Sequence, residues 1–379
     1  FASYLGRDRE TGEHLNSIPA LKGVLGVGYG FEQFGGELFA SKASSDSIGE
    51  DSCPAPPYTG RFYNCNFLHS NQSDMPDVDG TTLGLFLQDE IALADGKVRI
   101  TPGIRYDWYR QTPQETPGFT DNVTYTGLPD ESSDSAFSPK LRGEWDMGPG
   151  VTLFAQWAQA FRAPTASELY LSYGGPGTYL RLGDPALEPE TSNGFEIGAK
   201  LGDETFGGSI NGFYNRYKNF IDAVSVTPAE VGIPAGTYPM GITQTLNRDS
   251  VEIYGAEAMV YYKQELGWHG FASFASYLGR DRETGEHLNS IPALKGVLGV
   301  GYGFEQFGGD LILTGVAARN KVENDLSKTP GYGLVDVTGW WAPEALQGAK
   351  LKAGVYNLLD TTYYDALDIP DSATLPKEY

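Results

Sequence analysis

Long apolar runs are missing from this sequence. No stretch approaches the roughly eighteen apolar residues that a membrane-spanning helix requires, so a helical membrane protein is excluded. Basic residues are also scarce, since 27 Lys and Arg stand against 49 Asp and Glu and give a net charge of −22. Because nothing basic is clustered enough along the chain to neutralise phosphates, we predict no nucleic-acid partner.

Groups for catalysis and metal binding are few. The chain has four histidines and two cysteines, and it lacks the spacings of a metalloprotease helix, a nucleophile elbow, a phosphate loop or a zinc site. The acidic run of Asp74, Asp77 and Asp79 lacks the glycine turn and the bidentate acid of a Ca²⁺ loop. We therefore predict no enzyme activity, no metal site and no permanently bound cofactor.

Glycine and tyrosine are abundant, with 49 Gly, 23 Tyr and 13% aromatic residues. Segments of period-two alternation recur between turns, and including two in residues 1–36 we expect about fifteen strands. Beyond residue 36 the expected strands are 82–93, 97–110, 135–146, 151–161, 192–201, 206–221, 244–264, 268–280, 292–304, 310–322, 332–343 and 350–365. Short turns alternate with longer loops, which is typical of a transmembrane barrel.

The segment 97–110 shows what the two faces of this sheet carry. Its apolar residues share one face: Val98, Ile100, Ile104, Tyr106 and Trp108. Its polar residues share the other: Arg99, Thr101, Arg105 and Asp107. A soluble sandwich rarely directs Arg and Asp inward, so the pattern favours a barrel with a hydrated lumen and an apolar outer face.

The strand that ends in Phe-Arg-Ala-Pro at residues 161–164 opens the most informative loop. Proline has no backbone N–H for a ladder, so strand pairing stops there. A loop rich in Tyr and Gly follows, and Asp-Pro-Ala-Leu-Glu-Pro-Glu closes it at residues 184–190. These two boxes resemble the FRAP and NPNL boxes of TonB-dependent outer-membrane receptors, especially the haem and haemoglobin branch.

Two further stretches carry the same resemblance. Residues 64–80, NCNFLHSNQSDMPDVDG, look like a loop of the haem and haemoglobin branch. Residues 355–360, VYNLLD, followed by TTYY, are similar to the NLxDxxY signature of the penultimate strand of these receptors. The resemblance implies an all-β, antiparallel transmembrane barrel of the twenty-two-stranded kind, located in the bacterial outer membrane.

The resemblance also implies a function. We expect an active-transport receptor for haem or for a haem-carrying protein, energised by the TonB–ExbB–ExbD complex through a plug domain and surrounded by outer-membrane lipid. A ferric-siderophore receptor of the same fold is the alternative, and a passive porin is a weaker one. In both receptor functions the haem or siderophore is the transported cargo and is not a resident cofactor.

Candidate ligand contacts lie in the two loops that carry the resemblance. Tyrosine and histidine can serve as axial ligands of haem iron, and arginine can bind its propionates. The candidate substrate-binding residues are Arg162, Tyr170, Tyr173, Tyr179, Arg181 and His69. The alternative for the tyrosines is a place in the aromatic girdle at the membrane surface, and the alternative for His69 is a solvated loop residue.

Cys53 and Cys65 enclose a short loop rich in Pro, Gly and Tyr. Two free thiols are one interpretation, and a metal site needs more ligands nearby. A disulfide formed in an oxidising compartment fits the β context better, and we predict that pair.

One identical repeat divides the chain. Residues 1–36 recur letter for letter as residues 274–309, which we interpret as a recent duplication or a chimeric junction. We expect residues 37–379 to form the receptor barrel region. We also expect the plug domain and the last barrel strand to be absent from the chain.

Overall fold

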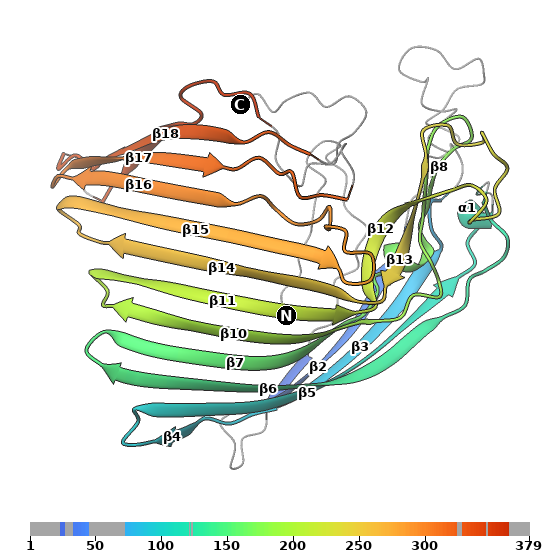
Figure 1. The fold of residues 1–379 in the computed structure, drawn as a ribbon, viewed down its shortest axis with the longest axis horizontal. Helices are drawn as coiled ribbons and strands as arrows, with labels where there is room; N and C mark the ends of the chain where they lie inside the picture. The colour runs from blue at the N-terminus through green and yellow to red at the C-terminus, as the bar shows by residue number, and fades with distance from the viewer. Residues whose placement is uncertain are drawn as a thin grey trace.

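The computed structural model describes residues 23–26, 33–44, 73–120, 122, 124–323, 328–345 and 348–363. A curved, antiparallel sheet of 15 strands forms most of it (Figure 1). Its strands are β1 (Gly23–Gly26), β2 (Gln33–Ala43), β3 (Asp77–Gln88), β4 (Ile91–Leu93), β5 (Val98–Gln114), β6 (Ser132–Gly148), β7 (Val151–Arg162), β10 (Glu190–Gly202), β11 (Phe206–Lys218), β14 (Val251–Tyr262), β15 (Gly267–Asp281), β16 (Lys295–Gly303), β17 (Phe307–Val316), β18 (Tyr332–Trp341) and β19 (Leu351–Val355). Within the described residues β1 and β19 are the edges, and the sheet does not close. The predicted all-β antiparallel class is confirmed.

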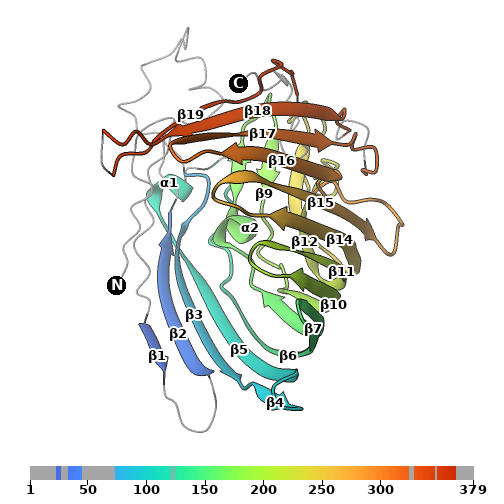
Figure 2. The same ribbon diagram turned by 90° about the vertical axis from the view of Figure 1, so that its left-hand side faces the viewer.

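A second sheet of four strands lies at one end of the large one (Figure 1). It orders its strands as β12, β13, β9 and β8, with bounds Phe220–Val226, Ile242–Arg248, Leu180–Leu182 and Ser172–Gly174. The β13–β9 pair is parallel, whereas the other two pairs are antiparallel. Two short helices, α1 (Pro117–Thr120) and α2 (Ala166–Tyr170), complete the described elements, and Figure 2 shows α2 and β9 inside the curve of the large sheet.

Three expected strands are interrupted in the structure, and two more end early: 310–322 ends at Val316 in β17, and 350–365 ends at Val355 in β19. The strand expected over 206–221 divides at Asn219, whose positive φ of 53° turns the chain from β11 into β12. The strand expected over 244–264 divides into β13 and β14, which belong to different sheets. The strand expected over 82–93 is interrupted at residues 89–90, between β3 and β4. Alternation alone does not reveal such breaks, because each half keeps a strand-like pattern.

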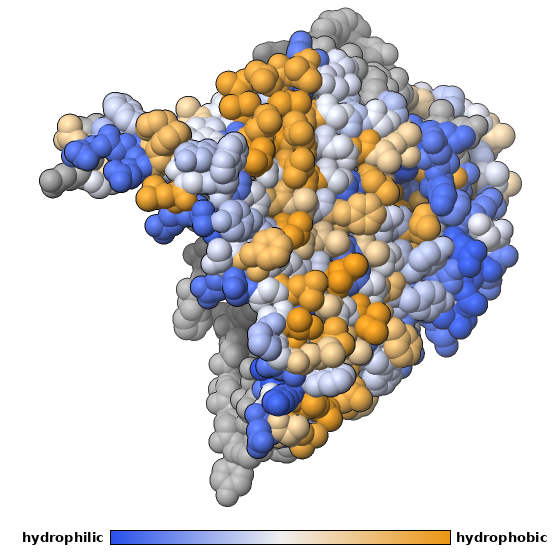
Figure 3. Space-filling model, turned by 60° about the vertical axis from the view of Figure 1, so that its left-hand side comes forward, coloured by the Kyte–Doolittle hydropathy of each residue, from blue (hydrophilic) through white to orange (hydrophobic). Residues whose placement is uncertain are grey.

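The predicted division into an apolar and a polar face is confirmed. Leu85, Tyr106 and Phe137 stand opposite one another on β3, β5 and β6, and Phe137 is 66% exposed. On the other face Arg105 donates from Nε to Asp107 at 2.7 Å and from Nη2 to Glu37 at 2.8 Å. Figure 3 shows a broad band of hydrophobic side chains down the middle of the face in view, with hydrophilic side chains gathered mainly to its right. In a soluble protein the apolar side chains face the core and the charged ones face water. Here the apolar side chains are exposed on the outer face and the charged ones lie on the inner face, which is the pattern of a membrane barrel.

The strand connections differ at the two ends of the sheet. Residues 149–150, 203–205 and 304–306 make short turns at one end, whereas residues 163–189 and 282–294 make long connections at the other. The predicted alternation of short turns and long loops is therefore confirmed. In outer-membrane barrels the long loops face outward from the cell.

The two identical segments pair differently. Gly23 of β1 stands opposite Leu38 of β2. Its equivalent in the second copy, Gly296 of β16, stands opposite Gly315, although the equivalent of Leu38 is Leu311. The same residues therefore adopt two registers. The observed partner Gly315 lies four positions beyond Leu311, the partner that the register of the first copy would give.

Candidate functional site

The long connection between β7 and β10 is a folded layer and not an open loop. Pro164 ends the strand, and α2 begins directly after it with Thr165 as its N-cap. The Thr165 hydroxyl accepts from the Glu168 amide at 3.3 Å, while Glu168 accepts from the Thr165 amide at 2.7 Å. This capping box explains why the chain turns into a helix at the end of the Phe-Arg-Ala-Pro motif.

Arg162 connects both ends of this layer. It donates from Nε and Nη2 to the two oxygens of Glu190 at 2.7 and 2.8 Å, and from Nη1 to Glu168 at 2.9 Å. Glu190 also accepts from the Ile221 amide at the start of β12, at 2.7 Å. Burial alone would raise the pKa of Glu168, but its bonds with Arg162 and Thr165 hold that pKa below the ordinary value. Whether Arg162 contacts a ligand stays a prediction.

The apolar core of the layer joins the two sequence boxes. Leu169 and Tyr170 of α2 pack with Leu187 of the second box and with Ile221 of β12. Tyr170 is 3% exposed and donates its hydroxyl to the Asp130 carbonyl at 3.0 Å. Burial raises the pKa of Tyr170 to about 12. Its predicted contact with a ligand is not tested, but its side chain has a defined place in the core.

Leu187 is a core residue of this layer that the sequence analysis did not single out. It is 5% exposed and follows a tight turn in which Asp184 accepts from the Ala186 amide at 2.9 Å. The neighbouring Gly183 lies so close to α2 that a Cβ would come within 2.7 Å of the Leu169 backbone. The sequence did contain a signal for this packing role, because Leu187 is the large apolar residue in the otherwise polar, Pro-rich box at residues 184–190.

Three of the predicted binding residues come together: Tyr173 on β8, Tyr179 directly before β9 and Arg181 within β9. The rings of Tyr173 and Tyr179 lie 5.8 Å apart, and the Arg181 guanidinium lies 5.7 Å from the Tyr179 ring. All three side chains are half-buried. A hydrogen bond to Tyr179, together with burial, raises the pKa of Tyr173 to about 12. This tyrosine–tyrosine–arginine group is the candidate binding cluster.

Asp74 lies near the same cluster. It precedes β3, its carbonyl accepts from the Ser172 amide at 2.7 Å, and its charge acts on the Tyr173 hydroxyl. Burial raises the pKa of the Asp74 carboxyl to about 6. An acidic group that titrates near pH 6 therefore stands beside a group of aromatic and cationic side chains.

Arg248 joins the second sheet to the end of β15 and to the connection after β17. At the end of β13 it pairs with Asp222 at 2.9 Å, with Asp281 at 3.6 Å and with Glu323 at 2.9 Å, and its side chain is only 11% exposed. Residues from β12, β15 and the connection after β17 thereby meet at one guanidinium. The candidate cluster is thus part of a layer that is held from several sides.

Some predicted residues lie outside the part of the chain that the structure describes. These are His69 and the proposed disulfide partners Cys53 and Cys65. Among the described residues, no cluster of His, Cys, Asp or Glu is suited to hold a metal ion. No helix in the described part is long and apolar enough to cross a membrane.

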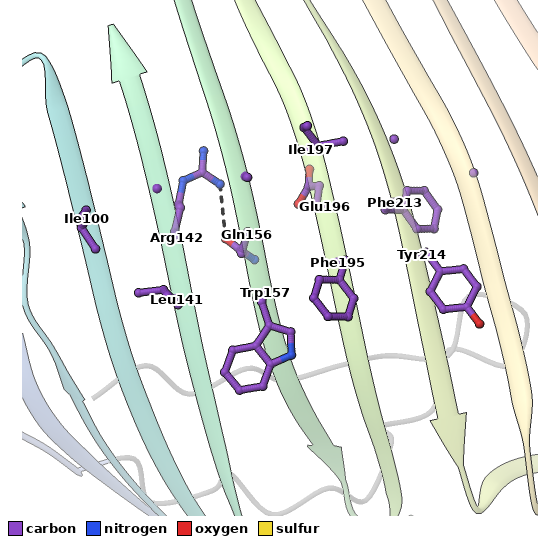
Figure 4. A pocket seen from close by; sticks show the side chains of 14 residues that line it. Ile100, Leu141, Arg142, Gln156, Trp157, Phe195, Glu196, Ile197, Phe213 and Tyr214 are labelled. Atoms are coloured by element: carbon purple, nitrogen blue, oxygen red, sulfur yellow. Dashed lines mark hydrogen bonds between the residues drawn. The ribbon is translucent and has the colours of Figure 1, made fainter.

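An apolar hollow of about 800 Å³ lies on the outward face of the large sheet. Trp157, Phe195 and Tyr214 stand side by side along it, on β7, β10 and β11 (Figure 4). Gly143 and Gly212 line it as well, and their lack of side chains leaves the space open. Because the hollow is separated by the sheet from the polar inner face, we do not assign it to the candidate cluster.

Comparison with known proteins decides the family. Residues 46–358 match the family described as "TonB dependent receptor-like, beta-barrel". The chain belongs to this family. TonB-dependent receptors are bacterial outer-membrane proteins and not a class of enzymes, so the predicted family and location are confirmed.

The TonB-dependent receptor chain has named relatives and solved structural neighbours. It is 28% identical over 316 residues to "Heme/hemopexin utilization protein C" of Haemophilus influenzae (strain 86-028NP), a match that covers 77% of this chain and 42% of that protein. The chain thus spans less than half the length of that relative. The copper transporter OprC superposes with a TM-score of 0.67 at 19% identity, covering 94% of this chain and 54% of OprC. The enterobactin-bound ferric enterobactin receptor of Pseudomonas aeruginosa gives 0.60 at 19% identity, with coverages of 96% and 53%.

Proposed function

We propose that this barrel region serves a receptor that takes up haem, or haem from a carrier protein, across the outer membrane. Uptake is energised by TonB with ExbB and ExbD, acting through a plug domain. The observation that carries the proposal is the Tyr173–Tyr179–Arg181 cluster, in a chain whose relative is named for haem utilisation. The cluster belongs to the layer at the long-loop end, which is where cargo arrives from outside.

The chemistry of the cluster suits haem. Two aromatic rings offer flat apolar contact to a porphyrin, and a phenol oxygen can ligate ferric iron. The hydrogen bond between Tyr173 and Tyr179 would stabilise a metal-bound oxygen on Tyr179, because hydrogen bonding to a charged form favours that form. Arg181, whose guanidinium lies 5.7 Å from the Tyr179 ring, would supply the cation for a propionate.

Arg162 and Tyr170 take a supporting role in this proposal. The ion pairs of Arg162 hold the two ends of the layer together, and Tyr170 fills its core. His69 is kept as a proposed second contact on the strength of the loop resemblance alone. We also propose the disulfide between Cys53 and Cys65.

A ferric-siderophore receptor is the second candidate function. The superposition on the ferric enterobactin receptor shows a shared fold, and aromatic rings with one arginine also suit an anionic ferric complex. A passive porin receives no such support, because the chain belongs to an energy-coupled receptor family.

The test is a haemin titration of the intact receptor in detergent, followed in the Soret region. We expect Tyr179→Phe to change the position of the Soret band and to weaken binding about tenfold, a loss of roughly 1.4 kcal/mol. Tyr173→Phe and Arg181→Gln should weaken binding without changing the ligand-type spectrum. Tyr302→Phe, on the outward face at the short-turn end, is the matched control and should have no effect.

Two results would count against the proposal, one against the ligand and one against haem as the cargo. Equal titrations for native and Tyr179→Phe protein would remove Tyr179 as the ligand. Saturable binding of ferric enterobactin without specific haemin binding would place the siderophore function first.

A further inference from the structure

Two aromatic rows mark the height of the apolar band on the outward face. The upper row runs across β7, β10, β11 and β14 as Trp157, Phe195, Tyr214 and Tyr254. The lower row includes Tyr262 on β14 and the contacting pair Trp268 and Tyr302, whose rings are 5.1 Å apart. The step from Tyr254 to Tyr262 spans ~26 Å along the strand, or ~20 Å after a 40° tilt, which is close to the expected apolar band. The upper row therefore lies at the outer membrane surface.

Basic side chains stand directly beyond the upper row. Arg216 and Lys218 follow Tyr214 on the same face of β11, and Arg280 stands opposite Glu252 on the neighbouring pair β14–β15. Arg282 follows Arg280, and all four basic residues are exposed. A step of two residues is ~7 Å along a strand, so these side chains reach the level of lipid headgroups.

One buried carboxylate orients two of these cations. Glu252, whose side chain is 6% exposed, pairs with Arg280 and lies 3.4 Å from Arg282 Nε. It also accepts from the Tyr214 hydroxyl of the aromatic row, at 2.9 Å. Of the acidic side chains in the described residues, only Glu252 forms an ion pair with any of the four cations. These four cations and Glu252 together carry a net positive charge, on a chain whose net charge is −22.

We propose that Arg216, Lys218, Arg280 and Arg282 form a docking surface for the phosphate groups of an outer-leaflet lipid. Its acyl chains lie against the upper aromatic row and in the apolar hollow beside it (Figure 4). Charge complementarity supports this occupant, since arginine forks match phosphate oxygens. Continuity supports it too, because the surface adjoins the lipid-facing side of the sheet and not the inner face. The proposal is independent of the cargo.

The test uses the intact receptor in phosphatidylcholine nanodiscs that contain a minor fraction of diphosphoryl lipid A or of the same lipid without its phosphates. Lipid that stays bound after detergent extraction is counted by native mass spectrometry. Native protein should retain the diphosphoryl form preferentially. The Arg216→Gln, Lys218→Gln double variant should lose about 25-fold in that preference, at roughly fivefold for each cation.

This double variant is chosen because neither residue has an ion pair within the described part of the chain, so folding should be unaffected. Arg280→Gln is the second variant and should lose about fivefold in that preference. Because it leaves Glu252 with only the longer contact to Arg282 as an ion pair, its thermal unfolding is measured in parallel. Lys263→Gln, at the short-turn end, is the matched control. Equal retention of the two lipids by native protein would overturn the proposal, and so would an unchanged preference in the double variant.

Discussion

Arg162 and Glu190 face each other across β7 and β10, and two hydrogen bonds of 2.7 and 2.8 Å join the residue that opens the long loop to the residue that closes it. Such a parallel pair of bonds sets both distance and orientation. The loop between them can therefore fold as a layer with a fixed base, on which Tyr173 and Tyr179 are carried.

Arg162→Gln should loosen this layer. It leaves Glu190, whose side chain is 9% exposed, without its charged partner, and because Arg162 itself is 41% exposed we expect a cost of about 2 kcal/mol, below that of a fully buried pair. Hydrogen exchange at the Leu169 and Leu171 amides, which bond within α2, should accelerate about 30-fold. Arg110→Gln is the control, since its partner Glu131 is 44% exposed and less than a threefold change is expected. Unchanged exchange in the Arg162 variant would show that the pair does not hold the layer.

Leu187→Ala should open the same layer through its core. The side chain packs against Leu169 and Tyr170, and truncation of a buried leucine costs about 3 kcal/mol. The rate of protease cleavage within residues 163–189 should rise about a hundredfold, because under conditions where opening is fast this rate is proportional to the fraction of molecules in which the layer is unfolded. Leu128→Ala, at a position 43% exposed, should leave the rate nearly unchanged. Equal rates for the two variants would contradict the assigned packing.

Asp74 should make cargo binding depend on pH. Burial raises its pKa from 3.8 to about 6, so the folded protein holds this proton more tightly than the unfolded chain does. Between those two values the contribution of Asp74 to stability falls as pH rises, because the folded state must give up a proton that the unfolded state has already lost. Above pH 6 its carboxylate adds negative charge near Tyr173, Tyr179 and Arg181.

Affinity for an anionic cargo should therefore fall about fivefold between pH 5 and pH 7.5. Haemin or ferric enterobactin titrations at several pH values measure this affinity. In Asp74→Asn the affinity should stay near its pH 5 value over the whole pH range. A profile that is unchanged in Asp74→Asn would assign the pH dependence to the cargo or to another group.

The strands were predictable because their signal is local. Alternation over residues 97–110 identified the outward face of β5 correctly, and the proline at position 164 marked the end of β7. The folded layer was not predictable from such patterns. Its parallel pairing of β9 with β13 joins Leu180 to Ile242, far apart in the chain, and nothing in the composition of a Gly- and Tyr-rich loop indicates that partner.

The sequence by itself determined the family, the class of fold and which residues face outward, because side chains alternate with a period of two and box motifs survive as short strings. Tertiary structure alone decided which distant residues meet. The four basic residues beside Glu252 are scattered in the chain and gather only when β11, β14 and β15 pair. The repeat makes the same point, since Gly23 and Gly296 have identical neighbours through residue 36 yet pair in different registers. Register depends on the partner strand and the adjoining sheet, and a segment's own residues do not contain that information.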